Sequence, residues 1–145
     1  MQISRAFMLP LLAASQVMLF ITAAMGAPLF SGTWNTVTSL NGHFIINMTK
    51  ATADGSKING VFINDGNAKY NGTLAGSVEG DGRGLFFTWE QPRMHDSGFG
   101  GFRMSADSRA ISGFFYITDP PGLAATKYDW SGTRQCGELL CGFQH

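Results

Sequence analysis

Apolar and polar residues alternate along the chain from about residue 30 onward, and no segment shows the spacing of an amphipathic helix. Phe44, Ile46 and Met48, for example, fall on one side of an extended segment. A strand with this alternation buries one face and exposes the other. The pattern predicts eight strands, over residues 30–37, 43–49, 57–63, 70–78, 83–90, 98–105, 110–117 and 127–134.

The segments between these strands are short and rich in turn-forming Asn, Asp, Gly, Ser and Pro. Short turns between consecutive strands favour an up-and-down antiparallel meander. An open sheet of this kind would leave two unpaired edge strands, and pairing the first strand with the last removes both edges. We therefore expect an all-β domain over residues 27–135, an eight-stranded antiparallel up-and-down barrel, with a β-sandwich as the alternative.

The first 26 residues differ from the rest of the chain. Arg5 is the only charged residue before Lys50, and the run Ala6–Met25 is uncharged and rich in Leu, Met, Ala and Phe. A basic start, an apolar stretch and small residues at its end are typical of a secretory signal peptide, so we expect cleavage after Gly26. An uncleaved membrane anchor is the alternative, because about 20 apolar residues can span a bilayer. Either way, we expect the barrel outside the cytoplasm, secreted or periplasmic.

The charge balance narrows the range of partners. The whole chain has ten Lys and Arg against ten Asp and Glu, so its formal net charge is zero, and the charges are scattered singly. Such a balance provides no basic face, and we therefore expect no nucleic-acid partner. We expect contact with a membrane only if the N-terminal segment stays uncleaved.

Both cysteines lie near the C-terminus. In an oxidising compartment, Cys136 and Cys141 are expected to form a local disulfide in the tail of residues 136–145. A redox motif of the CxxC type has tighter spacing. A zinc site would need more ligands than His145, the histidine that lies nearby, so we expect no metal.

The tryptophans and the strand alternation indicate candidate ligand-binding residues. Trp34 in the first strand is expected to have a structural role, filling one end of the barrel while its N–H bonds a backbone carbonyl. Aromatic side chains with a few polar groups suit a small apolar or ring-bearing ligand, although aromatic residues at alternate strand positions can equally be core. The candidate ligand-binding residues at the barrel mouth are Thr36, Phe62, Asn64, Trp89 and Trp130.

One segment contains all three residue types of a hydrolase triad, His95-Asp96-Ser97. Adjacent loop residues cannot form the nucleophile–base–orienter chain, because those side chains must converge from separate places. We interpret this segment as a solvated loop. No nucleophile elbow of the G-x-S-x-G kind occurs either. We therefore expect a protein that is not an enzyme, with no catalytic residues and no cofactor.

Three short phrases resemble avidin-like proteins: Gly32-Thr33-Trp34-Asn35, Ile58-Asn59-Gly60-Val61-Phe62 and Trp130-Ser131-Gly132. The resemblance implies a secreted eight-stranded barrel that binds biotin at its mouth and forms a homo-oligomer. Two positions depart from that family: Thr36 stands where avidins have a biotin-binding Asn, and Phe62 where they have a Tyr. The resemblance therefore concerns the architecture, and calycin-type barrels such as lipocalins are the related alternative.

Two functional hypotheses follow. The first is an exported, non-enzymatic barrel that binds a small apolar or ring-bearing ligand at its mouth. The alternative is a secreted protein-binding module or inhibitor whose barrel is fully packed by Phe44, Phe87, Phe102 and Phe115.

Overall fold

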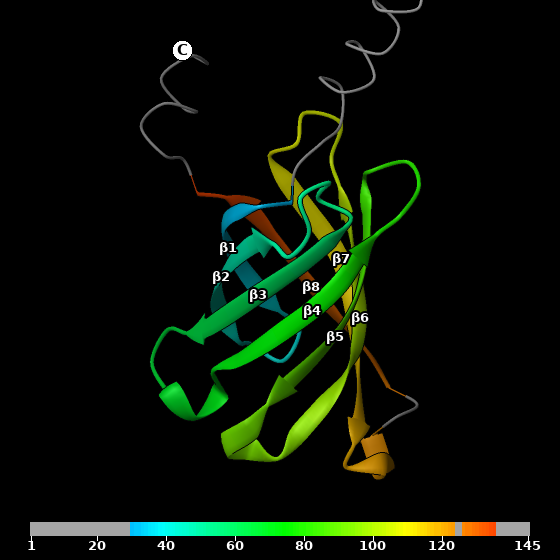
Figure 1. Ribbon diagram of the computed structural model, residues 1–145. Helices are drawn as coiled ribbons and strands as arrows, with labels where there is room; N and C mark the ends of the chain where they lie inside the picture. Colours follow the sequence, from blue (N-terminus) through cyan, green and yellow to red (C-terminus); the bar gives the residue numbers. More distant parts are fainter. Residues whose placement is uncertain (1–29, 124–125, 136–145) are drawn as a thin grey trace, which may run out of the picture.

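The computed structural model describes residues 30–123 and 126–135, which form one closed antiparallel barrel (Figure 1). Each strand pairs with its neighbours in chain order. Three single-turn 3-10 helices lie in the connections: η1 (Ala68–Tyr70), η2 (Pro92–Met94) and η3 (Pro121–Leu123). The strands are β1 (Gly32–Thr38), β2 (His43–Lys50), β3 (Lys57–Asn64), β4 (Gly72–Val78), β5 (Gly84–Gln91), β6 (Asp96–Met104), β7 (Ala110–Asp119) and β8 (Lys127–Arg134).

The barrel is closed by pairing between β1 and β8. Thr36 lies opposite Gly132, and Thr38 lies opposite Trp130, so the first and last strands share a ladder of backbone hydrogen bonds. No strand in the described part of the chain is left as an edge. The predicted barrel is confirmed, and the β-sandwich alternative is wrong.

The strand boundaries differ from the predicted ones by a few residues, for local reasons. β4 begins at Gly72 because Asn67 caps the preceding 3-10 turn, with its side-chain oxygen accepting the backbone N–H of Lys69. β6 begins at Asp96, two residues before the predicted start. His95 adopts a left-handed conformation (φ 56°) that turns the chain, and Asp96 then pairs with Gln91. The segment interpreted as a solvated loop therefore begins a strand, which is a correction.

Strand alternation places the apolar residues inside the barrel. Along β2 and β5, every second side chain is buried and the intervening ones are exposed. The core comprises Phe30, Trp34, Phe44, Ile46, Met48, Ile58, Phe62, Leu74, Leu85, Phe87, Trp89, Phe102, Met104, Ile111, Phe115, Ile117 and Trp130. Thr36 is the buried polar residue among them, with 1% of its surface exposed.

The two ends of the barrel differ. The connections β2–β3, β4–β5 and β6–β7 lie at one end, here called the closed end, at the top of Figure 1. The connections β1–β2, β3–β4, β5–β6 and β7–β8 lie at the opposite end, here called the open end.

Trp34 fills the closed end. Its side chain is fully buried, and its Nε1 donates a hydrogen bond to the carbonyl of Phe30 at 2.9 Å. The guanidinium of Arg134 lies over the indole, 4.2 Å from the ring centroid, a favourable cation–π distance. Arg134 also donates to the carbonyls of Ser31 (2.8 Å) and Ser108 (3.0 Å). Trp34 thus has the structural role predicted for it.

Several predictions fall on residues that the structure does not describe. The signal segment of residues 1–26 and the disulfide between Cys136 and Cys141 lie outside the described residues. Within residues 30–123 and 126–135, no helix has the length and apolar character needed to cross a membrane.

Candidate ligand-binding site at the open end

A cavity of about 410 Å³ opens at the open end of the barrel. The inward-facing ends of the strands and the connections at that end supply its walls, and a volume of this size is typical of small-molecule sites. The lining residues are Thr38, Leu40, Asn41, Gly42, Phe44, Phe62, Asn64, Tyr70, Trp89, Gln91, Asp96, Phe115, Ile117 and Trp130.

Trp130 forms the floor of this cavity. Its indole contacts three aromatic rings of the cavity wall, those of Phe44, Phe62 and Phe115, at centroid distances of 5.9, 5.5 and 5.6 Å. It also contacts Phe87 and Phe102, which lie in the core beyond the cavity, at 5.9 and 5.3 Å. Trp130 therefore separates an open compartment of the lumen, at the open end, from a packed one toward the closed end.

The orientation of Trp130 depends on a buried hydrogen-bond chain. Its Nε1 donates to the Oγ1 of Thr36 at 2.8 Å, and that hydroxyl donates in turn to the carbonyl of Phe44 at 2.9 Å. The polar atoms of both side chains are thus bonded within the protein. Trp130 offers a ligand its ring surface, whereas Thr36 holds that ring from behind.

Two polar side chains at the rim are also bonded internally. Asn64 accepts the backbone N–H of Asn67 (3.1 Å), and its amide donates to the carbonyl of His43 (3.4 Å). Gln91 donates from its side-chain nitrogen to the carbonyl of Tyr70 at 2.7 Å. These bonds connect β2 with β3 and η1 with β5 at the rim, and so fix the shape of the opening.

Four other polar side-chain groups of the lining have no hydrogen-bond partner among the described residues. These are the indole N–H of Trp89, the hydroxyl of Tyr70, the carboxyl group of Asp96 and the side-chain amide of Asn41. The side chain of Trp89 is 6% exposed, and its ring packs edge-on against Phe115, with centroids 5.8 Å apart. A buried donor without a partner costs about 1–3 kcal/mol, so such groups in a cavity are candidates for ligand contact.

Asp96 is the charged residue of the lining. Burial, together with the neighbouring charge of Asp119, raises the pKa of the Asp96 carboxyl group above its ordinary value, and His95 acts in the opposite direction. A perturbed carboxyl group in a cavity is a common mark of a functional site. Within the described ranges, no group of three or more His, Cys, Asp or Glu side chains could hold a metal ion.

The structure brings four of the five predicted site residues together. Phe62, Asn64, Trp89 and Trp130 line the cavity, and Thr36 lies behind the floor. Their contact with a ligand stays a prediction. The sequence analysis missed several lining residues, namely Tyr70, Gln91, Asp96 and Ile117. The alternation within β7 could have indicated Ile117, whereas Tyr70 and Asp96 border 3-10 turns that the alternation does not show.

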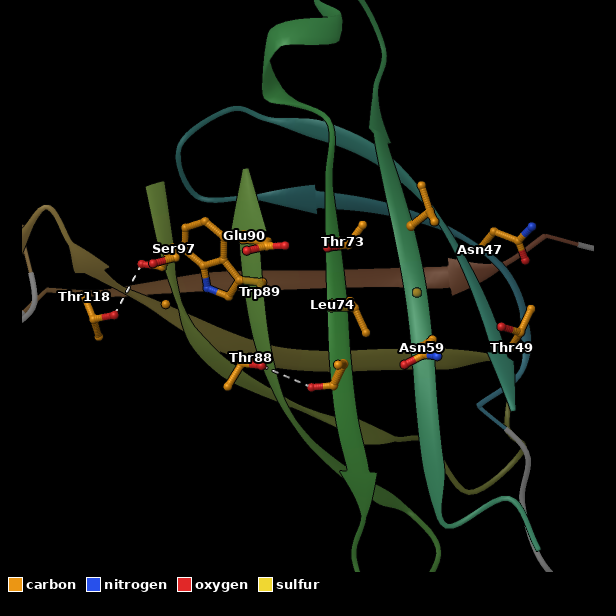
Figure 2. A pocket seen from close by; sticks show the side chains of 14 residues that line it. Asn47, Thr49, Asn59, Thr73, Leu74, Thr88, Trp89, Glu90, Ser97 and Thr118 are labelled. Atoms are coloured by element: carbon orange, nitrogen blue, oxygen red, sulfur yellow. Dashed lines mark hydrogen bonds between the residues drawn. The ribbon is translucent and has the colours of Figure 1, made fainter. Parts of the chain in front are cut away.

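A second hollow, of about 780 Å³, lies on the outer face of β2–β5 and reaches β6 and β7 (Figure 2). Most of its lining residues are solvent-exposed, among them the polar residues Asn47, Asn59, Thr73 and Glu90. Trp89 also borders it, and in Figure 2 the Trp89 ring lies beside Ser97. Exposed polar side chains on the outer face of a sheet are ordinarily solvated. The open-end cavity is therefore the better candidate site.

Comparisons with known proteins support the fold. The chain is similar to the redesigned β-barrel mFAP1 bound to DFHBI, with 12% sequence identity and a TM-score of 0.55, covering 72% of this chain and 94% of that one. It is also similar to the redesigned β-barrel b11L5F_LGL, with 8% identity and a TM-score of 0.56, covering 73% and 91%. No family model matches the chain, and no curated protein matches it. At these identities the likeness shows the barrel fold alone.

Proposed function

We propose that this protein is an exported, non-enzymatic barrel that binds a small ring-bearing ligand in its open-end cavity. The observation that carries the proposal is the cavity itself, with aromatic walls, a fixed tryptophan floor and polar groups that lack partners within the described residues. Apolar walls with a few placed polar groups are typical of small-molecule sites.

One structural neighbour supports ligand binding by a barrel of this fold. A barrel of similar fold, mFAP1, was determined bound to a small molecule, DFHBI. The avidin-like resemblance also implies a ligand at the barrel mouth. Recognition of biotin in the avidin manner is not part of the proposal, because the hydroxyl of Thr36 is already bonded to Trp130 and Phe44.

The alternative is a fully packed barrel that binds another protein. Phe44, Phe87, Phe102 and Phe115 do lie inside the barrel, as that hypothesis requires. Phe44 and Phe115, however, form walls of a 410 Å³ space and leave it unfilled. The cavity therefore favours the ligand-binding hypothesis.

A fluorescence titration tests the proposal. The probe is N-phenylnaphthylamine, a neutral three-ring compound whose emission increases in apolar surroundings, followed by a panel of neutral ring-bearing compounds that compete with it. We expect saturable binding of one probe per chain. No saturable binding of any compound in the panel would contradict the proposal.

A matched pair of variants locates the site. Ile117→Trp places a larger side chain in the cavity wall, whereas Ile63→Trp makes the same change on the outer face of β3, where Ile63 is 51% exposed. We expect the probe to bind the Ile63→Trp variant normally and the Ile117→Trp variant at least about tenfold more weakly. Equal effects of the two substitutions would place the probe elsewhere.

A further inference from the structure

We infer that the open-end cavity is adapted to an organic amine, a ring system that bears a hydrogen-bond acceptor on one side and a protonated amino group on the other. This inference rests on the proposed function and names the chemical class of its ligand. It is carried by three groups that line one cavity and have no hydrogen-bond partner among the described residues: two donors and one carboxyl group.

The first donor is the indole N–H of Trp89. Trp89 pairs with Gly98 on β6, and a Cβ added to Gly98 would lie 3.1 Å from Cε2, the ring carbon bonded to Nε1. The glycine thus leaves room for the indole edge beside β6, where Trp89 borders both the open-end cavity and the outer hollow. The N–H itself is buried and unpaired. An acceptor atom of a ligand that reaches this edge would remove the cost of the unpaired donor.

The second donor is the hydroxyl of Tyr70. Tyr70 is half-buried, packs against the core and lies at the end of η1. Its backbone carbonyl accepts the side chain of Gln91, which holds this segment against β5. The Gln91 bond therefore holds the Tyr70 segment at the rim, and Tyr70 lines the cavity there. Two donors in one cavity favour a ligand with at least one acceptor atom.

The acceptor is the carboxyl group of Asp96, the charged group of the lining among the described residues. The carboxylate of Asp119 is close enough to affect its ionisation, so the negative potential at this point of the rim comes from two residues. The neighbouring His95 acts in the opposite direction on the pKa of Asp96. A cation at Asp96 would relieve the repulsion between the two carboxylates, whereas an anion would add to it.

The sheet register fixes the separation of these groups. Trp89 lies opposite Gly98, and Asp96 is two residues farther toward the rim on the same strand, β6. Two residues of an extended strand span roughly 7 Å. A two-ring compound with its acceptor on one ring and an aminomethyl group on the other has dimensions of this order, and the rings of Phe62, Phe115 and Trp130 provide its apolar contacts.

Four related probes test each part of the inference by isothermal titration calorimetry. Aminomethylquinoline has both the acceptor and the amine, aminomethylnaphthalene has the amine alone, quinoline has the acceptor alone, and quinoline carboxylate has the acceptor with a negative charge. We expect aminomethylquinoline to bind most tightly and quinoline carboxylate most weakly. The difference between these two should be at least about tenfold, because hydrogen bonds to charged groups are stronger than those between neutral groups.

Variants assign each contact. Asp96→Asn should weaken both amines by about tenfold or more and leave quinoline unchanged. Trp89→Phe should weaken aminomethylquinoline several-fold and leave aminomethylnaphthalene unchanged, because that probe has no acceptor to lose. Asp65→Asn is the matched control, since Asp65 is an exposed carboxylate outside the lining that contacts His43. It removes one negative charge at the same end and should leave all four affinities within about twofold.

The outcomes separate this inference from the proposed function. If N-phenylnaphthylamine binds and the four probes bind equally or the carboxylate binds best, the inference is overturned and the proposed function stands. If neither N-phenylnaphthylamine nor any of the four probes binds, both fail. If Asp65→Asn weakens the amines as much as Asp96→Asn does, the preference for cations comes from the overall charge of that end and the assigned contact is wrong.

Discussion

Trp34 and Trp89 are both buried indoles on the inner face of one barrel, at opposite ends, and their surroundings differ sharply. Trp34 has its N–H bonded to Phe30 and its ring covered by Arg134. Trp89 has an unpaired N–H and borders a cavity. The closed end therefore satisfies its polar groups within the fold, whereas the open end leaves polar groups unsatisfied. Unpaired polar groups of this kind destabilise the protein alone, and a bound ligand that pairs with them offsets the destabilisation.

The carboxyl groups of the two ends show the same contrast. Each connection at the closed end has an Asp whose side chain accepts the backbone N–H two residues later: Asp54, Asp81 and Asp107. Hydrogen bonds from these loops and their neighbours lower the pKa of all three carboxyl groups. At the open end, burial and Asp119 raise the pKa of Asp96. The closed-end carboxylates stabilise their turns, whereas the ionised form of Asp96 is destabilised by its surroundings.

The largest effect is expected from Trp34→Phe. The substitution leaves the carbonyl of Phe30 without its buried donor and weakens the contact with Arg134, so the free energy of unfolding should fall by roughly 2–4 kcal/mol. Urea denaturation followed by circular dichroism measures this change. A loss below about 1 kcal/mol would show that the closed end does not depend on this tryptophan.

A smaller loss is expected from Thr36→Val, which keeps the shape of the side chain and removes its hydroxyl. The N–H of Trp130 then has no acceptor and the carbonyl of Phe44 loses a donor, so the free energy of unfolding should fall by about 1–3 kcal/mol. Ligand affinity should fall as well, because the floor of the cavity is less firmly held. Unchanged stability and affinity together would contradict the role assigned to Thr36.

Trp89→Phe should change stability little. The native N–H has no partner to lose, so removal of the unpaired donor offsets part of the lost packing, and the free energy of unfolding should stay within about 1 kcal/mol of the native value. The same denaturation experiment on Trp34→Phe and Trp89→Phe compares the two ends directly. Equal losses for the two variants would remove the distinction between them.

The smallest effects are expected in the pH dependence of thermal stability. Because the pKa of Asp96 is raised in the folded protein, its ionised form destabilises the fold above that pKa, and this cost disappears as the pH falls below it. Asp96→Asn should therefore raise the melting temperature at neutral pH and leave it unchanged in acid. A lower melting temperature for Asp96→Asn at neutral pH would contradict this assignment.

Asp54 provides the opposite case at the closed end. Hydrogen bonds from Ser56 and Thr52 lower the pKa of its carboxyl group from 3.8 to about 2. The ionised group therefore stabilises its turn above pH 3.8, and the contribution is lost as the pH falls toward 2. Asp54→Asn should lower the melting temperature slightly at neutral pH and converge with the native protein in strong acid. Differential scanning calorimetry across this pH range checks both variants.

The strand order and part of the cavity wall could be predicted from the chain, because they depend on local alternation. Phe62, Trp89 and Trp130 each fall on the inner face by parity alone, and all three line the cavity. Asp96 could not be placed this way. It enters the wall because His95 adopts a left-handed conformation and β6 begins earlier than the alternation indicates. Such a backbone reversal at a residue other than glycine has no clear signal in one sequence.

The sequence by itself determined that eight short strands alternate, because periodicity and turn chemistry act over a few residues. Closure of the ring was inferred from the edge strands, and the pairing of β1 with β8 decided it against the β-sandwich. The sequence assigned Trp34 a structural role, but it did not determine how the roles of Trp89 and Trp130 differ. Tertiary structure decided those roles by bringing together residues distant along the chain: the hydroxyl of Thr36 meets an indole 94 positions away, and Arg134 covers Trp34. Trp130 finds its acceptor through such long-range placement, whereas Trp34 bonds the carbonyl of Phe30 nearby in the chain and Trp89 finds no acceptor among the described residues.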